Sequence, residues 1–195
     1  DEYDRMEKLY FGGEWAEAED SSVQAYVIAQ HNHIPTRLPH QISYRHLVNV
    51  AQMAPTFEGV VEILERTDDL SDMTESDRKR LSRRIDCVRY WLNGFAPDSV
   101  KFSVSSTVPS GIELSMNEKV FLKALSVKMY DCNWDPDSIG STIADTAKDS
   151  PLGLKGGYGA MYRIFIGKKA GPRLGTFLAS MDKSFVINRI IQASN

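Results

Sequence analysis

Cysteine is scarce in this chain, and its scarcity excludes two classes of cross-linked protein. The 195 residues include two cysteines, Cys87 and Cys132, which lie far apart and have no second ligand type nearby. A disulfide framework needs several cysteines, and a structural zinc site needs closely spaced ligand pairs. We therefore predict that both are small buried hydrophobic residues in a protein of a reducing compartment.

Long hydrophobic runs and net positive charge are also missing. No apolar stretch approaches the roughly 20 residues of a membrane-spanning helix, and the acidic start of the chain is unlike a signal peptide. The net charge is −3, so a nucleic-acid partner would need a local basic patch. These absences predict a cytoplasmic protein without membrane contact. The first residue is Asp rather than Met, which predicts a piece of a longer protein.

Motifs for catalysis and for nucleotide binding are absent as well. The chain has no Gly-x-Ser-x-Gly, no His-Glu-x-x-His and no glycine-rich phosphate loop. His31 and His33 are two residues apart, so they would lie on different faces of a helix, and no acidic residue or cysteine is near them. We predict a polar loop before Pro35, and no metal, cofactor or active site within this chain.

Helix signals, in contrast, run through most of the sequence. Ser43, Thr74 and Ser115 precede apolar residues at helical spacing, and the last two begin capping boxes. Asp135, with proline directly after it, predicts another helix start. Alternation near residues 99–112 predicts at most one minor extended or hairpin segment. The sequence therefore predicts an all-α fold, an irregular bundle of eight or nine helices.

The helix predicted from Thr74 to Asn93 has a strongly basic first half. Its basic residues are Arg78, Lys79, Arg80, Arg83 and Arg84. They could contact phosphates, bind a protein, or form a solvated face that balances the acidic residues 68–72. We favour the solvated face, because basic clusters on helices are often the solvent side.

A glycine-proline corner follows the helix predicted from Tyr158 to Ile166. Gly167 is suited to end that helix, and Pro172 is suited to start the next one. Two interpretations of the corner stay open. Free backbone N–H groups and the basic residues Lys168, Lys169 and Arg173 would together suit a bound phosphate. Alternatively, the corner is only a tight turn, with Arg173 paired to an acid such as Asp182.

Several short motifs surround this corner. They are Tyr162, Gly167-Lys168, the Gly-Pro-Arg-x-Gly run 171–175, Phe177-Leu178, and the Asp-Lys-Ser-Phe-Val-Ile run 182–187 with Arg189. They resemble the C-terminal signature of class I (archaeal-type) lysyl-tRNA synthetases. Residues 3–10 and 44–52 are similar to further parts of that family, so the resemblance covers nearly the whole chain.

The resemblance implies the helical, anticodon-binding region of such an enzyme, an α-helix cage. Residues 1–40 would be a linker or helical subdomain after the catalytic core, and residues 41–195 would be the anticodon-binding domain. The implied partners of this monomeric fragment are tRNA(Lys) and the enzyme's own N-terminal catalytic domain. That Rossmann domain, which uses ATP with magnesium, is not in this chain, so the fragment of the ligase would have no activity itself.

The role implied by the resemblance predicts RNA-binding residues near the corner. They are Tyr158, Tyr162, Arg163, Lys168, Lys169 and Arg173. Aromatic rings stack on unpaired bases and basic side chains hold the backbone, although which tyrosine stacks and which fills the core stays open. Two alternatives remain: the equivalent region of a glutamyl-tRNA synthetase, and a helical protein-interaction module that uses residues 78–84 or the acidic stretch 14–20.

Overall fold

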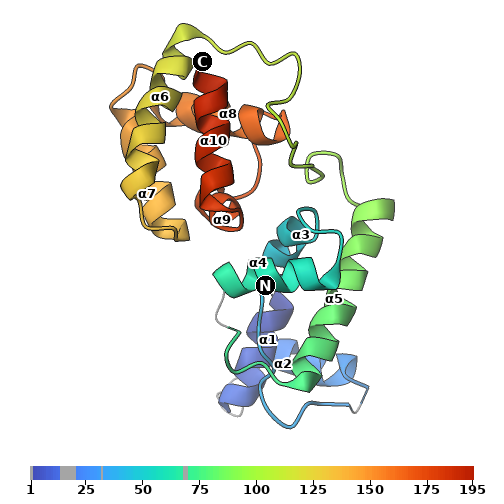
Figure 1. The fold of residues 1–195 in the computed structure, drawn as a ribbon. Helices are drawn as coiled ribbons and strands as arrows, with labels where there is room; N and C mark the ends of the chain where they lie inside the picture. Colours follow the sequence, from blue (N-terminus) through green and yellow to red (C-terminus); the bar gives the residue numbers. More distant parts are fainter. Residues whose placement is uncertain (1, 14–20, 32, 68–69) are drawn as a thin grey trace.

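The computed structural model describes residues 2–13, 21–31, 33–67 and 70–195, and within these ranges it contains ten helices and no strand. Figure 1 shows two groups of helices joined by a long connector, residues 95–115. The N-terminal lobe comprises α1 (Glu2–Gly12), α2 (Ser21–Ala29), α3 (Tyr44–Val50), α4 (Phe57–Thr67) and α5 (Glu75–Gly94). The C-terminal lobe comprises α6 (Met116–Asp131), α7 (Pro136–Lys148), α8 (Gly153–Ile166), α9 (Leu174–Ala179) and α10 (Lys183–Ser194). The predicted all-α fold is confirmed.

The helices start where the capping signals predicted. Ser43 accepts a hydrogen bond from the amide of the third residue after it, and Thr74 and Ser115 each form a complete capping box. Asp135 caps α7 through two backbone amides. One start differs, because α8 begins at Gly153 rather than at Tyr158. Gly157 lets α8 pack closely on α7 and α6, since an added Cβ atom would lie 2.6 Å from Ala147 and 3.2 Å from Phe121, and this packing offsets the poor helix propensity of glycine.

Each lobe has its own hydrophobic core. The cluster in the N-terminal lobe includes Leu47, Leu64 and Val88, and the cluster in the C-terminal lobe includes Phe121 and Phe165. The boundary between the two clusters lies in the connector, and the predicted division at residue 40 stays a prediction. The lobes nevertheless touch, since α4 contacts α9 and Met53 packs against both clusters.

The favoured interpretation of a solvated basic face on α5 holds for Arg78, Lys79 and Arg83, which are exposed, but it is wrong for the two arginines that face α1. Arg80 lies 2.9 Å from the carboxylate of Glu7, which is fully buried, and Arg84 lies 3.2 Å from that of Asp4. Tyr26 of α2 also donates to Glu7, at 2.9 Å. Basic residues on one helix face can point into solvent or pair with buried carboxylates of another helix. The helical-wheel pattern is the same for both arrangements, so it does not distinguish them.

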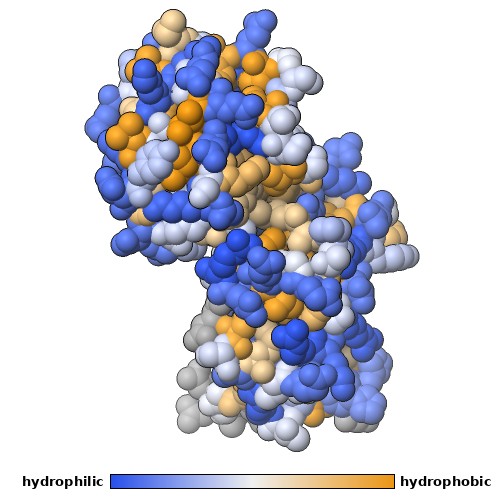
Figure 2. All heavy atoms as spheres, viewed as in Figure 1, coloured by the Kyte–Doolittle hydropathy of each residue, from blue (hydrophilic) through white to orange (hydrophobic). Residues whose placement is uncertain are grey.

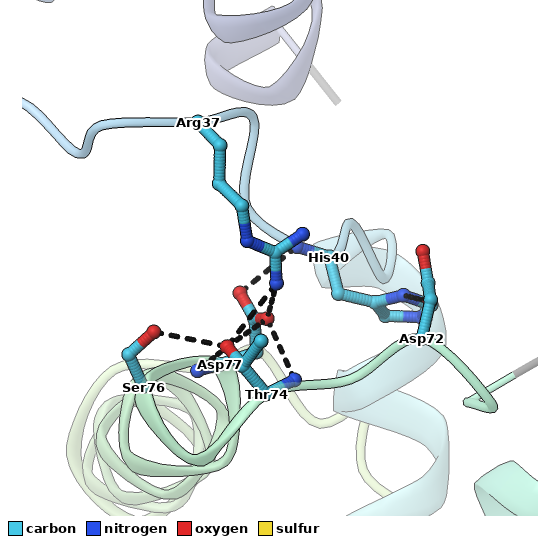
Figure 3. Close-up of polar contacts among 6 residues, drawn as sticks. All are labelled: Arg37, His40, Asp72, Thr74, Ser76 and Asp77. Atoms are coloured by element: carbon cyan, nitrogen blue, oxygen red, sulfur yellow. Dashed lines mark hydrogen bonds and ion pairs between the residues drawn. The ribbon is translucent and has the colours of Figure 1, made fainter.

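The segment before α3 is fixed on the N-terminus of α5 by Asp77 (Figure 3). This carboxylate accepts hydrogen bonds from the backbone amides of Thr74 and His40, and it pairs with Arg37. Burial alone would raise the pKa of Asp77, but these hydrogen bonds and the arginine outweigh burial and lower it. His40 also contacts Asp72 at 2.9 Å, so this joint is polar throughout.

Arg189 fixes the connector to the C-terminal lobe. Its guanidinium is buried beside the rings of Phe165 and Phe185, at 5.6 and 5.0 Å from their centroids. It donates to the carbonyl of Ile164 at 2.9 Å and to that of Ser105 at 2.6 Å. Burial lowers the pKa of this arginine, while the carbonyl of Ile164, at the C-terminal end of α8, favours its charge.

Neither cysteine is fully buried, contrary to the prediction. Cys87 is exposed and Cys132 is half-buried. On α5 the helical period turns Ile85 and Val88 inward, so Cys87 falls on the outer face. The residue type suggested burial, but its place on the wheel decided otherwise.

The surface is mostly hydrophilic, with hydrophobic patches on both lobes (Figure 2). The apolar residues exposed on α6 are Met116, Val120, Val127 and Tyr130. None of the described helices has the length and apolar character required to cross a membrane.

Candidate nucleic-acid interface

The predicted corner between α8 and α9 is tightly built. Gly167 ends α8 in the left-handed conformation, with φ of 67°, and its amide donates to the carbonyl of Arg163 at 3.0 Å. Tyr162 is buried and its hydroxyl donates to the carbonyl of Pro172 at 2.6 Å. Burial raises the pKa of this phenol, with a smaller contribution from Tyr158, so the hydroxyl remains a donor. Tyr162 therefore holds the corner together, and its ring lies in the core rather than on the surface.

The helix after the corner is short and packs closely against α7. It has six residues and begins at Leu174, and no side chain caps its N-terminus. A Cβ atom added to Gly175 would lie 2.1 Å from the carbonyl oxygen of Pro136, so only glycine fits there. So short a helix, with its first turn packed on protein, does not support the predicted phosphate site at its N-terminus.

Arg173 pairs with an acid, but not with the one named from the sequence. Its guanidinium lies 3.1 Å from Asp137 at the start of α7, and both side chains are exposed. Asp182 instead caps α10, accepting from the amide of Phe185 at 2.9 Å. The sequence interval could not identify the partner, because α7 reaches the corner only through the tertiary fold.

A cleft of about 860 Å³ lies where the corner, the connector, α3 and the end of α5 meet. All the charged side chains that line it are basic among the described residues. They are Arg45, Lys101, Lys168 and Arg173, with His46 beside them. Three aromatic residues also line the cleft, namely Tyr44, Trp91 and Phe102. A chain with net charge −3 thus concentrates positive charge and aromatic rings in one hollow.

The acids that pair with cations of the cleft, Asp98 and Asp137, are both exposed. Lys168 donates to two backbone carbonyls, that of Asp98 at 2.7 Å and that of Lys101 at 2.5 Å, and neither partner carries charge. Arg45 is exposed, and no ion pair joins it to the described residues. Lys101 lies 3.9 Å from an exposed Asp98. Exposed pairs of this kind contribute about 0–1 kcal/mol, so an anion could readily displace them.

Tyr44 lines the cleft with a half-buried aromatic ring. Its hydroxyl pKa is raised, first by burial and also by the nearby Cys87, so the group stays protonated at neutral pH. Its ring offers an apolar face to the cleft.

The predicted RNA-binding residues do not form one group. Lys168 and Arg173 line the cleft, but the other four do not. Arg163 pairs with Glu118 of the α6 cap, and Tyr158 packs against the core of the C-terminal lobe. Lys169 is exposed beside the corner. RNA contact by these side chains stays a prediction, while the buried Tyr162 has a structural role.

Six of the basic and aromatic residues of the cleft were not predicted from the sequence as site residues: Tyr44, Arg45, His46, Trp91, Lys101 and Phe102. A signal existed for the first three, since residues 44–52 resemble the same family. Trp91 and Lys101 gave no local signal, because they meet the corner only when the two lobes come together.

Comparison with known proteins identifies similar chains. No protein-family model matches this one. A lysine–tRNA ligase of Thermococcus kodakarensis is 36% identical over 197 aligned residues, which cover 97% of this chain and 37% of that protein. Those of Pyrococcus horikoshii and Methanocaldococcus jannaschii are each 31% identical over 97% of this chain, which spans 37% and 38% of their lengths. The chain therefore spans little more than a third of these relatives.

Proposed function

We propose that this chain, a relative of part of the archaeal lysine–tRNA ligases along nearly its whole length, binds the anticodon stem-loop of tRNA(Lys) in its basic cleft. These relatives confirm the resemblance to class I lysyl-tRNA synthetases described from the corner motifs. Joining lysine to tRNA, with ATP and magnesium, belongs in this proposal to the catalytic domain of the parent enzyme. The chain itself supplies recognition, and that catalytic domain is its second partner.

The observation that carries the proposal is the lining of the cleft. Cations without an acid among the described lining residues attract a polyanion, and three aromatic side chains stand among them. Unpaired RNA bases stack on such rings, while basic groups hold the backbone. A folded loop offers both unpaired bases and phosphates, whereas a protein partner would require complementary acidic groups at this site.

A salt titration tests the proposal directly. Binding of a fluorescent tRNA(Lys) stem-loop to the chain is followed by anisotropy between low and physiological salt. Arg45→Ala should weaken binding roughly tenfold at low salt and reduce the salt slope by about one, because it removes one phosphate contact. The control is Lys128→Ala, a lysine of α6 outside the cleft, which should leave affinity and slope unchanged. Equal behaviour of both variants would overturn the site assignment.

The two sequence-based alternatives can be weighed in the same experiment. A glutamyl-tRNA synthetase region would prefer a tRNA(Glu) stem-loop, and the similar proteins named above favour lysine instead. A protein-interaction module that uses residues 78–84 has less surface than expected, because Arg80 and Arg84 are engaged by α1. The acidic stretch 14–20 lies outside the described residues.

A further inference from the structure

A smaller hollow adjoins the cleft at the connector. Its volume is about 360 Å³, and it shares Lys101 and Phe102 with the cleft. Its other walls come from α5 and from the end of α3, mainly Arg89, Asn93 and Gln52. We call the hollow formed by Gln52, Arg89, Asn93, Lys101 and Phe102 the side pocket. Small-molecule sites begin at about 300 Å³, so the hollow can receive one compact group but not a folded domain.

The charge of the side pocket has the same sign as that of the cleft. Arg89 donates one hydrogen bond, to the backbone carbonyl of Ala54 at 3.2 Å, and no carboxylate pairs with it among the described residues. Lys101 is the second cation, and no acidic residue of the described chain lines the hollow. Two cations line the hollow, and Asp98, which lies 3.9 Å from Lys101, is fully exposed, so the hollow favours an anionic group such as a phosphate.

The polar side chains of the side pocket have separate roles. Gln52 accepts a hydrogen bond from the amide of Phe102 at 2.8 Å and donates to the carbonyl of Val48 at 3.0 Å, so it fixes the connector. Asn93 is exposed, and no hydrogen bond engages its amide within the described residues. Arg89 and Asn93 are four residues apart on α5, so they lie on one helix face. One face therefore presents a cation beside an amide that can both donate and accept.

We propose that the side pocket binds one unpaired nucleotide of the RNA strand whose neighbouring nucleotides occupy the cleft. Arg89 and Lys101 bind its phosphate, and Asn93 forms hydrogen bonds with the edge of its base. This assignment rests on the proposed function of the cleft and adds a position at which the base is read. Lys101 and Phe102 carry the strand from one hollow into the other.

RNA stem-loops that each lack the base at one position of the loop test this assignment. A series of tRNA(Lys) stem-loops, each with an abasic site at one loop position, is titrated with the chain and with Asn93→Ala. For the wild-type chain, one abasic position should cost roughly tenfold in affinity through the side pocket. Asn93→Ala should bind the intact loop roughly tenfold more weakly and show no further loss at that same position. The control Asn117→Ala, an exposed asparagine of α6, should behave as wild type.

A second pair of variants tests the phosphate contact. Arg89→Ala should lower the salt slope of binding by about one, whereas Arg83→Ala, an exposed arginine of the same helix, should not. If Asn93→Ala and Arg89→Ala both match wild type while Arg45→Ala weakens binding, the side-pocket assignment is overturned and the cleft proposal stands. If the wild-type chain does not bind the intact loop, both proposals are overturned.

Discussion

Both lobes have an apolar core, but in the N-terminal lobe α1 is joined to α5 through ion pairs. In the N-terminal lobe, α1 contacts α5 through Asp4 and Glu7, which meet Arg84 and Arg80. In the C-terminal lobe, α6 to α10 enclose one large apolar cluster. An apolar core tolerates the exchange of one apolar side chain for another of similar volume. The loss of one partner of a buried ion pair destabilises a protein strongly, because the other charge stays buried without a partner. The comparison suggests that the C-terminal lobe is the stable support of the corner, while charge pairs orient the N-terminal lobe.

The largest expected effect is loss of a core ring in the C-terminal lobe. Phe165 is fully buried and contacts Phe177 edge-on, with centroids 6.3 Å apart. Phe165→Ala should lower the free energy of unfolding by about 3–5 kcal/mol, because it leaves a cavity. Urea unfolding measures this change. Phe95→Ala, at an exposed position, should change stability by less than about 0.5 kcal/mol. A similar loss for both variants would contradict the proposed contrast between core and surface.

Removing charge from the N-terminal lobe should have the next largest effect. Glu7→Gln leaves Arg80 without its carboxylate and should destabilise the lobe by about 3 kcal/mol, with faster amide exchange in α1 and α2. The double variant with Arg80→Met should lose less than the sum of the single changes. Glu2→Gln, whose partner Arg5 is exposed, should cost less than about 1 kcal/mol. If the losses of stability in the two single variants added up to the loss in the double variant, Glu7 and Arg80 would not be energetically coupled.

Acid should weaken the joint at Asp77 in the N-terminal lobe. Its folded pKa is lowered, so its contribution is complete above the unfolded value of about 3.9 and is lost as pH falls through the folded value. Asp77→Asn should cost about 1–2 kcal/mol at neutral pH and reduce the decline of stability in acid. Thermal melts between pH 3 and 7 measure both. An unchanged acid decline would show that other carboxylates dominate it.

The smallest expected effect is at the corner. Tyr162→Phe removes the hydrogen bond to the Pro172 carbonyl and should cost about 1 kcal/mol, since the ring still fills its place. RNA affinity should change little, because the hydroxyl is engaged inside the protein. Tyr158→Phe, with a half-buried ring, serves as the matched tyrosine control for stability. If Tyr162→Phe strongly weakened RNA binding without changing stability, Tyr162 would have to be assigned to RNA contact and not to the core.

Local signals predicted the helices well and the site in part. The caps at Thr74, Ser115 and Asp135 were confirmed because a cap is a contact between residues two or three apart. Lys168 and Arg173 were named correctly as residues at the corner, but the cleft around them needs Arg45 and Trp91 from the other lobe. Such contacts leave no periodic trace in the sequence.

Residue order alone was enough for the all-α class, for the helix starts that have a capping side chain and for the similarity to lysine–tRNA ligases. Only the tertiary structure decided which charges are used internally and which are presented. Carboxylates of other helices pair with Arg80, Arg84 and Arg163. Lys168 instead donates hydrogen bonds to uncharged backbone carbonyls, so no acid neutralises its charge. The physical reason is that a side chain's sequence neighbours set its helix face, but the partner that meets that face comes from a distant part of the chain.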